Sequence, residues 1–149
     1  MASPIAVVLE QQEGRITRLS WEALGAARQL GDALGAPVDA IVLGANAEAL
    51  AAEAAAHGVR KALAVASSVL DKYTPDGYSR ALAGLLGTAD YSHVIFPHSY
   101  QVREFAPQLA AKLDRPFLSD CIGFVREGAE TVFSRQLYQG KLVADVSFE

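Results

Sequence analysis

Short apolar runs rich in β-branched residues alternate along this chain with longer segments in which Ala and Leu recur at helical spacing. Such alternation is typical of parallel strands joined by covering helices. Because the runs are almost continuously hydrophobic, we expect both faces of each strand to be buried. The pattern predicts an α/β fold with a doubly wound, mainly parallel sheet and helices on both faces. The four expected strands are residues 5–9, 38–43, 62–66 and 94–96.

Capping residues mark where the helices between these strands begin and end. We expect Ser20 to cap the first helix, and Gly35 to end it in the left-handed conformation. Asn46 is the expected cap of the second helix, and His57 fits its last turn, near the negative end of the helix dipole. Thr74 followed by proline predicts the start of the third helix, because proline at the first helical position lacks only a donor that has no partner there.

A fourth helix is expected between residues 101 and 113, where apolar side chains follow helical spacing. Pro107 interrupts this segment, and proline is tolerated in an α-helix only in the first turn or at a kink. We therefore expect the regular part of this helix to begin near Glu104.

The pattern changes from helical to alternating after the fourth helix. Residues 117–125, 131–137 and 142–148 are expected to be strands, separated by turn signals at Gly128 and Gly140. We predict that these strands form an antiparallel β ribbon. Its last strand has one consistently apolar face, and such a face needs a packing partner.

Length and charge restrict the partners that such a chain can have. Its 149 residues fit one domain of ordinary size, so we expect a single domain over residues 1–149. With 13 Lys and Arg against 17 Asp and Glu, the net charge is -4. An acidic chain is a poor match for nucleic acid or an anionic membrane surface. No apolar run approaches the roughly 20 residues that cross a bilayer, and residues 1–9 lack the basic start of a signal sequence.

Residue sets for catalysis or metal binding are scarce. Cys121 is the only cysteine, and we expect it to be buried in a strand as a small hydrophobic residue. No His/Cys cluster has the spacing of a zinc site, so we predict no metal centre and no catalytic residues. His93 is expected at the sheet edge opposite the ligand side. A chain that cannot form an internal disulfide fits a cytoplasmic location.

The loop after residues 94–96 is the best candidate binding site. Ligands of open α/β sheets lie beyond the carboxyl ends of the strands, and His98 and Ser99 precede a helix whose first amides are able to hold phosphate. The alternative is that Ser99 only caps the helix and His98 is a surface residue. A Ser-His-Asp site would need a distant Asp to converge on two adjacent loop residues. No glycine-rich phosphate loop follows the first strand, where Glu10 comes directly after Leu9.

Four stretches occur in an order that resembles one known family. They are FPHS at residues 96–99, FAPQLAAKL at 105–113, SD at 119–120 and FSRQLYQGK at 133–141. The first strand and helix are similar to the same family, so the resemblance covers the whole chain. It is a resemblance to the α subunit of electron transfer flavoprotein.

The resemblance implies a structural role for this chain. In the family, the N-terminal α domain pairs with a similarly folded β subunit that binds AMP, and a separate C-terminal domain holds FAD. The heterodimer passes electrons from flavin dehydrogenases to an acceptor. This chain is expected to be that N-terminal scaffold domain in a bacterial cytoplasm, without the FAD domain and with no cofactor of its own. The ribbon residues Arg135, Tyr138 and Leu142 are the expected contact with the β subunit, and His98 and Ser99 are expected to form a vestigial nucleotide loop that stays empty.

Two other functions stay open on the residues alone. The first is a free-standing adenine-nucleotide-binding domain of the universal-stress-protein type, acting through the loop at Ser99. The second is a small hydrolase that rests only on His98 and Ser99. The missing glycine-rich motif argues against the first, and the ribbon favours the scaffold.

Overall fold

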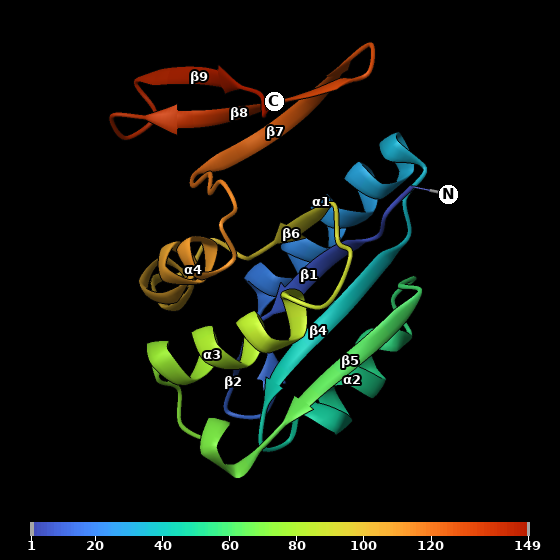
Figure 1. Ribbon diagram of the computed structural model, residues 1–149, viewed down its shortest axis with the longest axis vertical. Coiled ribbons are helices and arrows are strands. Elements are labelled where there is room, and N and C mark those ends of the chain that lie inside the picture. The colour runs from blue at the N-terminus through green and yellow to red at the C-terminus, as the bar shows by residue number, and fades with distance from the viewer. Residues whose placement is uncertain (1, 149) are drawn as a thin grey trace.

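The computed structural model describes residues 2–148 and contains a four-stranded parallel sheet covered by helices (Figure 1). The strand order is β5-β4-β1-β6, and every pairing in this sheet is parallel. The strands are β1 (Ile5–Leu9), β4 (Val38–Gly44), β5 (Lys61–Ala66) and β6 (His93–Ile95). The predicted doubly wound sheet is confirmed, and each strand lies within one residue of its expected bounds.

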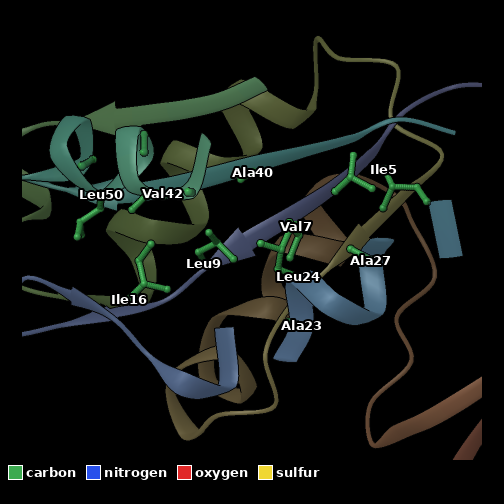
Figure 2. Close-up of a cluster of buried hydrophobic side chains, with 14 of the residues drawn as sticks. Ile5, Val7, Leu9, Ile16, Ala23, Leu24, Ala27, Ala40, Val42 and Leu50 are labelled. Atoms are coloured by element: carbon green, nitrogen blue, oxygen red, sulfur yellow. The ribbon is translucent and has the colours of Figure 1, made fainter. Parts of the chain in front are cut away.

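Helices cover both faces of this sheet and divide the core into two clusters. The helices are α1 (Arg18–Leu34), α2 (Ala47–Ala55), α3 (Pro75–Leu86) and α4 (Tyr100–Lys112), with a short 3₁₀ turn η1 (Ser68–Leu70) before α3. In the first cluster Val7 and Leu9 pack with α1 and α2 through residues such as Leu24 and Leu50 (Figure 2). In the second cluster the opposite face of β1 packs with α3 and α4. Alternate side chains of one buried strand therefore serve both clusters, as a strand with two buried faces requires.

Two of the predicted helix ends are confirmed, and two of the predicted N-caps differ from the structure. Gly35 ends α1 with φ 63°, and the Thr74 hydroxyl caps α3 by accepting from the Gly77 amide at 3.2 Å. Asn46 occupies the N-cap of α2 without a side-chain hydrogen bond. The prediction for α1 was wrong, because Thr17 caps this helix and Ser20 is fully buried inside its first turn.

The fourth helix begins earlier than predicted. Ser99 caps α4 by accepting from the Val102 amide at 3.1 Å, so the regular helix starts at Tyr100 rather than near Glu104. Pro107 therefore lies in the helix interior, where its missing N–H leaves the Arg103 carbonyl without its usual intrahelical partner. Both residues are exposed, so water is able to take this hydrogen bond.

A short hairpin follows β1 and was not predicted. It consists of β2 (Gln11–Gln12) and β3 (Arg15–Ile16), paired antiparallel. Glu13 and Gly14 form its turn with φ 49° and 74°, and two successive left-handed residues are the geometry that closes a two-residue hairpin.

The C-terminal ribbon is a separate antiparallel sheet, as predicted. Its strands are β7 (Cys121–Glu127), β8 (Glu130–Leu137) and β9 (Leu142–Val146), in the order β7-β8-β9. Figure 1 shows this ribbon above the parallel sheet, in orange and red. The first ribbon strand begins four residues later than predicted, because Asp120 takes φ 57°, which an extended strand does not allow.

Aromatic side chains attach the ribbon to the α/β unit. Phe124 and Phe133 are cross-strand partners on one face of the ribbon, and both pack against the first core cluster. The Phe133 ring lies 5.9 Å from that of His93, at the start of β6, and 6.0 Å from that of Phe148. These contacts involve the central part of the ribbon. They do not reach its outer end, which is the turn between β8 and β9.

A buried carboxylate joins the starts of three strands at the amino edge of the sheet. Asp39 in β4 is fully buried and accepts from Arg60 Nε and Nη2 at 2.8 and 2.6 Å. It also accepts from the Tyr91 hydroxyl at 2.9 Å, and Lys61 Nζ lies 3.7 Å away. This network lies opposite the edge at which ligands bind in such sheets, so its role is structural.

Candidate functional site

The strand order reverses at β1, which places the expected ligand crevice between the carboxyl ends of β1 and β6. The chain runs outward from β1 to β4 and β5, and then crosses to β6 on the other side of β1. Crevices of this kind bind ligands in open α/β sheets. The residues that follow the two strands here are Glu10 after β1 and the loop up to Ser99 after β6.

The first turn of α1 fixes the position of Glu10. The Glu10 amide donates to the Ser20 hydroxyl at 2.7 Å, and that hydroxyl donates to the Glu10 carbonyl oxygen at 3.0 Å. The Thr17 amide also donates to this carbonyl oxygen at 3.0 Å. The buried Ser20 hydroxyl thus provides hydrogen bonds for the backbone amide and carbonyl of Glu10, where the chain leaves the sheet.

A hydrogen bond closes the crevice between the two strand ends. The Ser99 hydroxyl donates to the Glu10 carboxylate and accepts from the Val102 amide at 3.1 Å. The interpretation that Ser99 caps helix α4 is therefore confirmed. Because a carboxylate lies against the first turn of α4, an anionic ligand at these amides would meet a like charge.

Side chains fill the space beneath this hydrogen bond. The remaining cavity has a volume of about 10 Å³, which is close to the space that one water molecule needs. Its lining residues are Val8, Leu9, Glu10, Leu43, Tyr78, Gln101, Val102 and Phe105. Burial raises the pKa of Tyr78, with a smaller contribution in the same direction from the charge on Glu10. The crevice is closed and mostly apolar.

An open depression lies next to the closed crevice, over the start of α4. The Tyr73 hydroxyl lies 3.1 Å from the Gln101 carbonyl oxygen and 2.9 Å from Glu104 Oε2, and both atoms are acceptors. Burial, followed by the hydrogen bond to Glu104, raises the pKa of Tyr73. The depression has a volume of about 660 Å³ and is lined by Tyr73, Tyr100, Gln101, Arg103 and Glu104. It is a surface feature in which Tyr100 remains 89% exposed.

His98 and Ser99 have different partners, so they do not form a hydrolase site. His98 Nε2 lies 3.3 Å from Asp120 Oδ1, which brings a distant Asp to the histidine as a catalytic triad would require. The Ser99 hydroxyl, however, donates to Glu10 rather than to the imidazole. Sequence reasoning missed both carboxylates. Only the position of Glu10, directly after a buried strand, was a local signal for its role.

The other two candidate residues lie away from this crevice. Cys121 is exposed at the start of β7, so the expectation that it is buried was wrong. The neighbouring residues still shield its thiol partly from water, and this desolvation raises the pKa of the thiol. Apart from Phe124, all of β7 is exposed, so a place in this strand does not bury Cys121. His93 lies at the amino end of β6, as predicted, and burial and then the charge on Arg115 lower its pKa.

The predicted ribbon contact residues divide into two groups. Tyr138 and Leu142 are 75% and 55% exposed at the outer end of the ribbon. Arg135 is half-buried, and its Nη2 donates to Ser119 Oγ at 3.4 Å. Arg135 therefore faces the segment that connects α4 to the ribbon, and only the other two residues form an accessible surface.

Neither a metal cluster nor a membrane helix was found in the part of the chain that the structure describes. Within residues 2–148, no group of three or more His, Cys, Asp or Glu side chains is arranged to hold a metal ion. No helix in the same range has both the length and the hydrophobicity to span a bilayer.

Comparison with known proteins gives one consistent family. Residues 5–149 match the family model of the electron transfer flavoprotein domain. The chain is 31% identical over 144 residues to electron transfer flavoprotein subunit alpha of Bacillus subtilis, covering 95% of this chain and 43% of the relative. It is 32% identical over 140 residues to the protein of the same name in Syntrophomonas wolfei, covering 94% and 43%. It thus spans less than half the length of these curated relatives, and by the match over nearly all of its own length it belongs to the electron transfer flavoprotein family.

Proposed function

We propose that this chain is the N-terminal structural domain of an electron transfer flavoprotein α subunit. The relatives with this name are more than twice as long as the aligned region, so most of an α subunit lies outside the 149 residues. We assign FAD to that other part, and AMP to a partner β subunit. The whole heterodimer would then accept electrons from flavin dehydrogenases and pass them to an acceptor in the bacterial cytoplasm, with this domain as a scaffold that transfers none.

The closed crevice at the strand reversal is the observation that carries this proposal. A site that encloses a nucleotide or flavin usually has about 300–1,000 Å³, whereas the cavity under the Ser99–Glu10 hydrogen bond has about 10 Å³. The depression over α4 is larger, but it is an open surface lined by only five residues, so it does not enclose a ligand. Neither of these two spaces fits a flavin, and in this proposal the chain takes no step of electron transfer.

The outer end of the ribbon supports the assignment of a protein partner. Tyr138 and Leu142 are large, exposed and adjacent to the turn that joins β8 and β9. Tyrosine is enriched at the centres of protein interfaces because it provides a large contact area with a polar group at its tip. We propose that this end of the ribbon contacts the β subunit.

Co-purification with the β subunit of the same organism tests the proposal. A tagged form of this chain should retain the β subunit, and Tyr138→Asp should reduce the retained amount at least tenfold, because it places a charge in an apolar contact. Tyr100→Asp is the matched control, since Tyr100 is also a highly exposed tyrosine but lies on α4. Retention unaffected by Tyr138→Asp would remove the ribbon from the interface, and no retention by the unmodified chain would contradict the scaffold role.

Ligand binding by the chain alone separates the scaffold from the nucleotide-binding alternative. Calorimetric titration with AMP and ATP should give no saturable heat, and the protein desalted after incubation with FAD should lack a flavin absorption band. A dissociation constant of about 1 μM or tighter for a nucleotide would favour the alternative, and a stoichiometric flavin band would place the cofactor site in these residues.

A further inference from the structure

A histidine lies where the ribbon meets the α/β unit. His93 is the first residue of β6, and the centre of its ring is 5.9 Å from that of Phe133 in β8. The Phe133 ring also lies 6.4 and 6.0 Å from the rings of Phe124 and Phe148. His93 thus contacts the centre of the aromatic cluster that attaches the ribbon. Its imidazole is the ring of this contact whose charge changes between about pH 5 and 8.

The hydrogen bond of this imidazole suits its neutral form. His93 Nδ1 lies 3.1 Å from Ser92 Oγ. The Ser92 hydroxyl also lies 3.2 and 3.3 Å from the carbonyl oxygens of Ser3 and Pro4, which only accept. Because the single hydroxyl proton goes to a carbonyl oxygen, the Ser92 oxygen is left to accept from Nδ1–H. The neutral ring therefore has its partner without a second proton.

The charged groups beside His93 do not compensate a second proton either. The charge that acts on the imidazole is the cation of Arg115, whose Nη2 donates to the Tyr91 carbonyl oxygen at 3.3 Å. Asp90, in the loop before β6, accepts from the Ser3 hydroxyl at 2.9 Å instead. Burial, and then the Arg115 charge, lower the pKa of His93 below its ordinary value of 6.5.

The other elements around this imidazole present apolar side chains or charges that have partners elsewhere. In β1 the register partner of His93 is Ile5, and α1 contributes apolar side chains to the core cluster on which Phe133 packs. In the ribbon, Arg135 and Asp145 each form a hydrogen bond with a serine. The docked ribbon therefore excludes water from the ring without providing a carboxylate for it.

We propose that the ribbon docks onto a neutral His93 and is released when this imidazole gains a proton. Once the ribbon moves away, water reaches the ring and solvates its charge. Below about pH 6.5 the released state therefore binds the proton more readily than the docked state, and docking weakens progressively as the pH falls. Release exposes the segment of residues 113–120 and leaves the parallel sheet folded. It does not depend on the proposed contact with a β subunit.

Two contacts oppose this release, so the experiment has to separate them from it. A charged imidazole is attracted to the face of the Phe133 ring. His98 Nε2 lies 3.3 Å from Asp120 Oδ1 at the start of the ribbon, and a protonated His98 forms an ion pair there. Both contacts would make docking tighter in acid, which is the opposite of the proposed effect of His93.

Limited proteolysis within residues 113–120 at about pH 7.5 and about pH 5.5 tests the proposal. His93→Phe keeps a ring beside Phe133 but takes up no proton. The cleavage rate of the unmodified chain, divided by that of His93→Phe with the same protease at the same pH, should rise about three- to tenfold on acidification, because an exposed imidazole is about ten parts protonated to one part neutral at pH 5.5. His98→Gln is the control, and it should show at least the same rise because the ion pair to Asp120 opposes release.

Proton NMR of the histidine rings measures the same coupling from the other side. The His93 signal, identified by its absence in His93→Phe, should titrate at lower pH in the unmodified chain than in Phe133→Ala, where the ribbon is released. Val125→Ala, at an exposed ribbon position, should leave this titration unchanged. Equal titration of His93 with and without the Phe133 ring would overturn the proposal. A cleavage ratio that stays constant or falls on acidification would overturn it as well.

Discussion

At the scale of single residues, two carboxylates at opposite edges of the sheet have opposite surroundings. Asp39 has a bidentate guanidinium and a phenol hydroxyl as partners, so its buried charge is compensated. The Glu10 carboxylate accepts from the Ser99 hydroxyl and from the Gln12 side-chain amide at 3.4 Å, both neutral donors. The first arrangement stabilises the fold, and the second fills the place where a ligand would otherwise lie.

Asp39→Ala should be strongly destabilising. It leaves the buried Tyr91 hydroxyl without its acceptor and removes the bond that connects β4 with the segments before β5 and β6. Losses of this type cost about 3 kcal/mol, and urea denaturation measures them. Arg18→Ala is the control, because the Arg18–Glu22 pair is exposed and contributes about 0.5 kcal/mol or less. An Asp39 variant as stable as that control would show that the network is dispensable.

Tyr91 should make stability fall at alkaline pH. Burial, and then the hydrogen bond to Asp39, raise the pKa of Tyr91 to about 12 from its ordinary value of 10.0. The folded state thus favours the neutral phenol, so this contribution is fully present below pH 10 and is lost as the pH rises toward 12. The difference in unfolding free energy between the unmodified protein and Tyr91→Phe should shrink across this window. A difference that stays constant with pH would show that the Tyr91 phenol ionises alike in the folded and unfolded chain.

At the scale of elements, helix α4 combines a strong start with a weak interior. Ser99 provides both the N-cap and the bond to Glu10, whereas Pro107 removes an intrahelical hydrogen bond eight residues later. The cap determines where the helix begins, and tertiary packing of Phe105 and Leu109 holds the turn around the proline. Local sequence signals therefore set the boundary of this helix, and the core sets its continuity.

Pro107→Ala should stabilise the protein by about 1 kcal/mol. Alanine restores the amide that bonds to the Arg103 carbonyl oxygen, and this gain exceeds the smaller loss from a more flexible unfolded chain. Thermal unfolding followed by circular dichroism measures the change. Pro116→Ala, outside any helix, should give no increase, and a lower midpoint for Pro107→Ala than for the unmodified protein would contradict the prediction.

Sequence patterns predicted the elements better than they predicted the site. The four parallel strands, the Gly35 and Thr74 helix ends and the ribbon follow from periodicity and capping that lie within a few neighbouring residues. Ser20 was assigned wrongly because its hydroxyl bonds to Glu10, ten residues away, rather than to its own helix. The Ser99–Glu10 bond joins positions 89 residues apart, and no local pattern encodes such a pairing.

At the scale of the whole molecule, two sheets of different kind meet through a small aromatic contact. The central strands β1 and β4 are buried on both faces, whereas the edge strands β5 and β6 are only partly buried, contrary to the expectation for each strand. The ribbon touches the α/β unit mainly through Phe124 and Phe133. The ribbon also leaves Ile122, Val125 and Val143 more than half exposed. Stability should therefore be unequal across the chain, with the ribbon as the part that opens most easily.

Phe133→Ala should release the ribbon without unfolding the α/β unit. Removing this ring deletes the contacts with His93, Phe124 and Phe148 at once. Limited proteolysis within residues 113–120 should become at least fivefold faster, while amides of β1 keep their protection from hydrogen exchange. Val125→Ala, at an exposed position of the same ribbon, is the control. Equal cleavage rates in both variants would show that Phe133 does not hold the ribbon in place.

The antiparallel ribbon at the end of a parallel sheet has a mechanical consequence. The described chain ends beyond β9, beside the start of β8, so tension applied there separates the open end of a hairpin and breaks its hydrogen bonds one after another. The same tension pulls β1 at its amino end and β6 at its carboxyl end. Because these two strands are parallel, the force shears the pair and loads all of its hydrogen bonds together. Under force, the ribbon would therefore open first, while the parallel sheet stays intact.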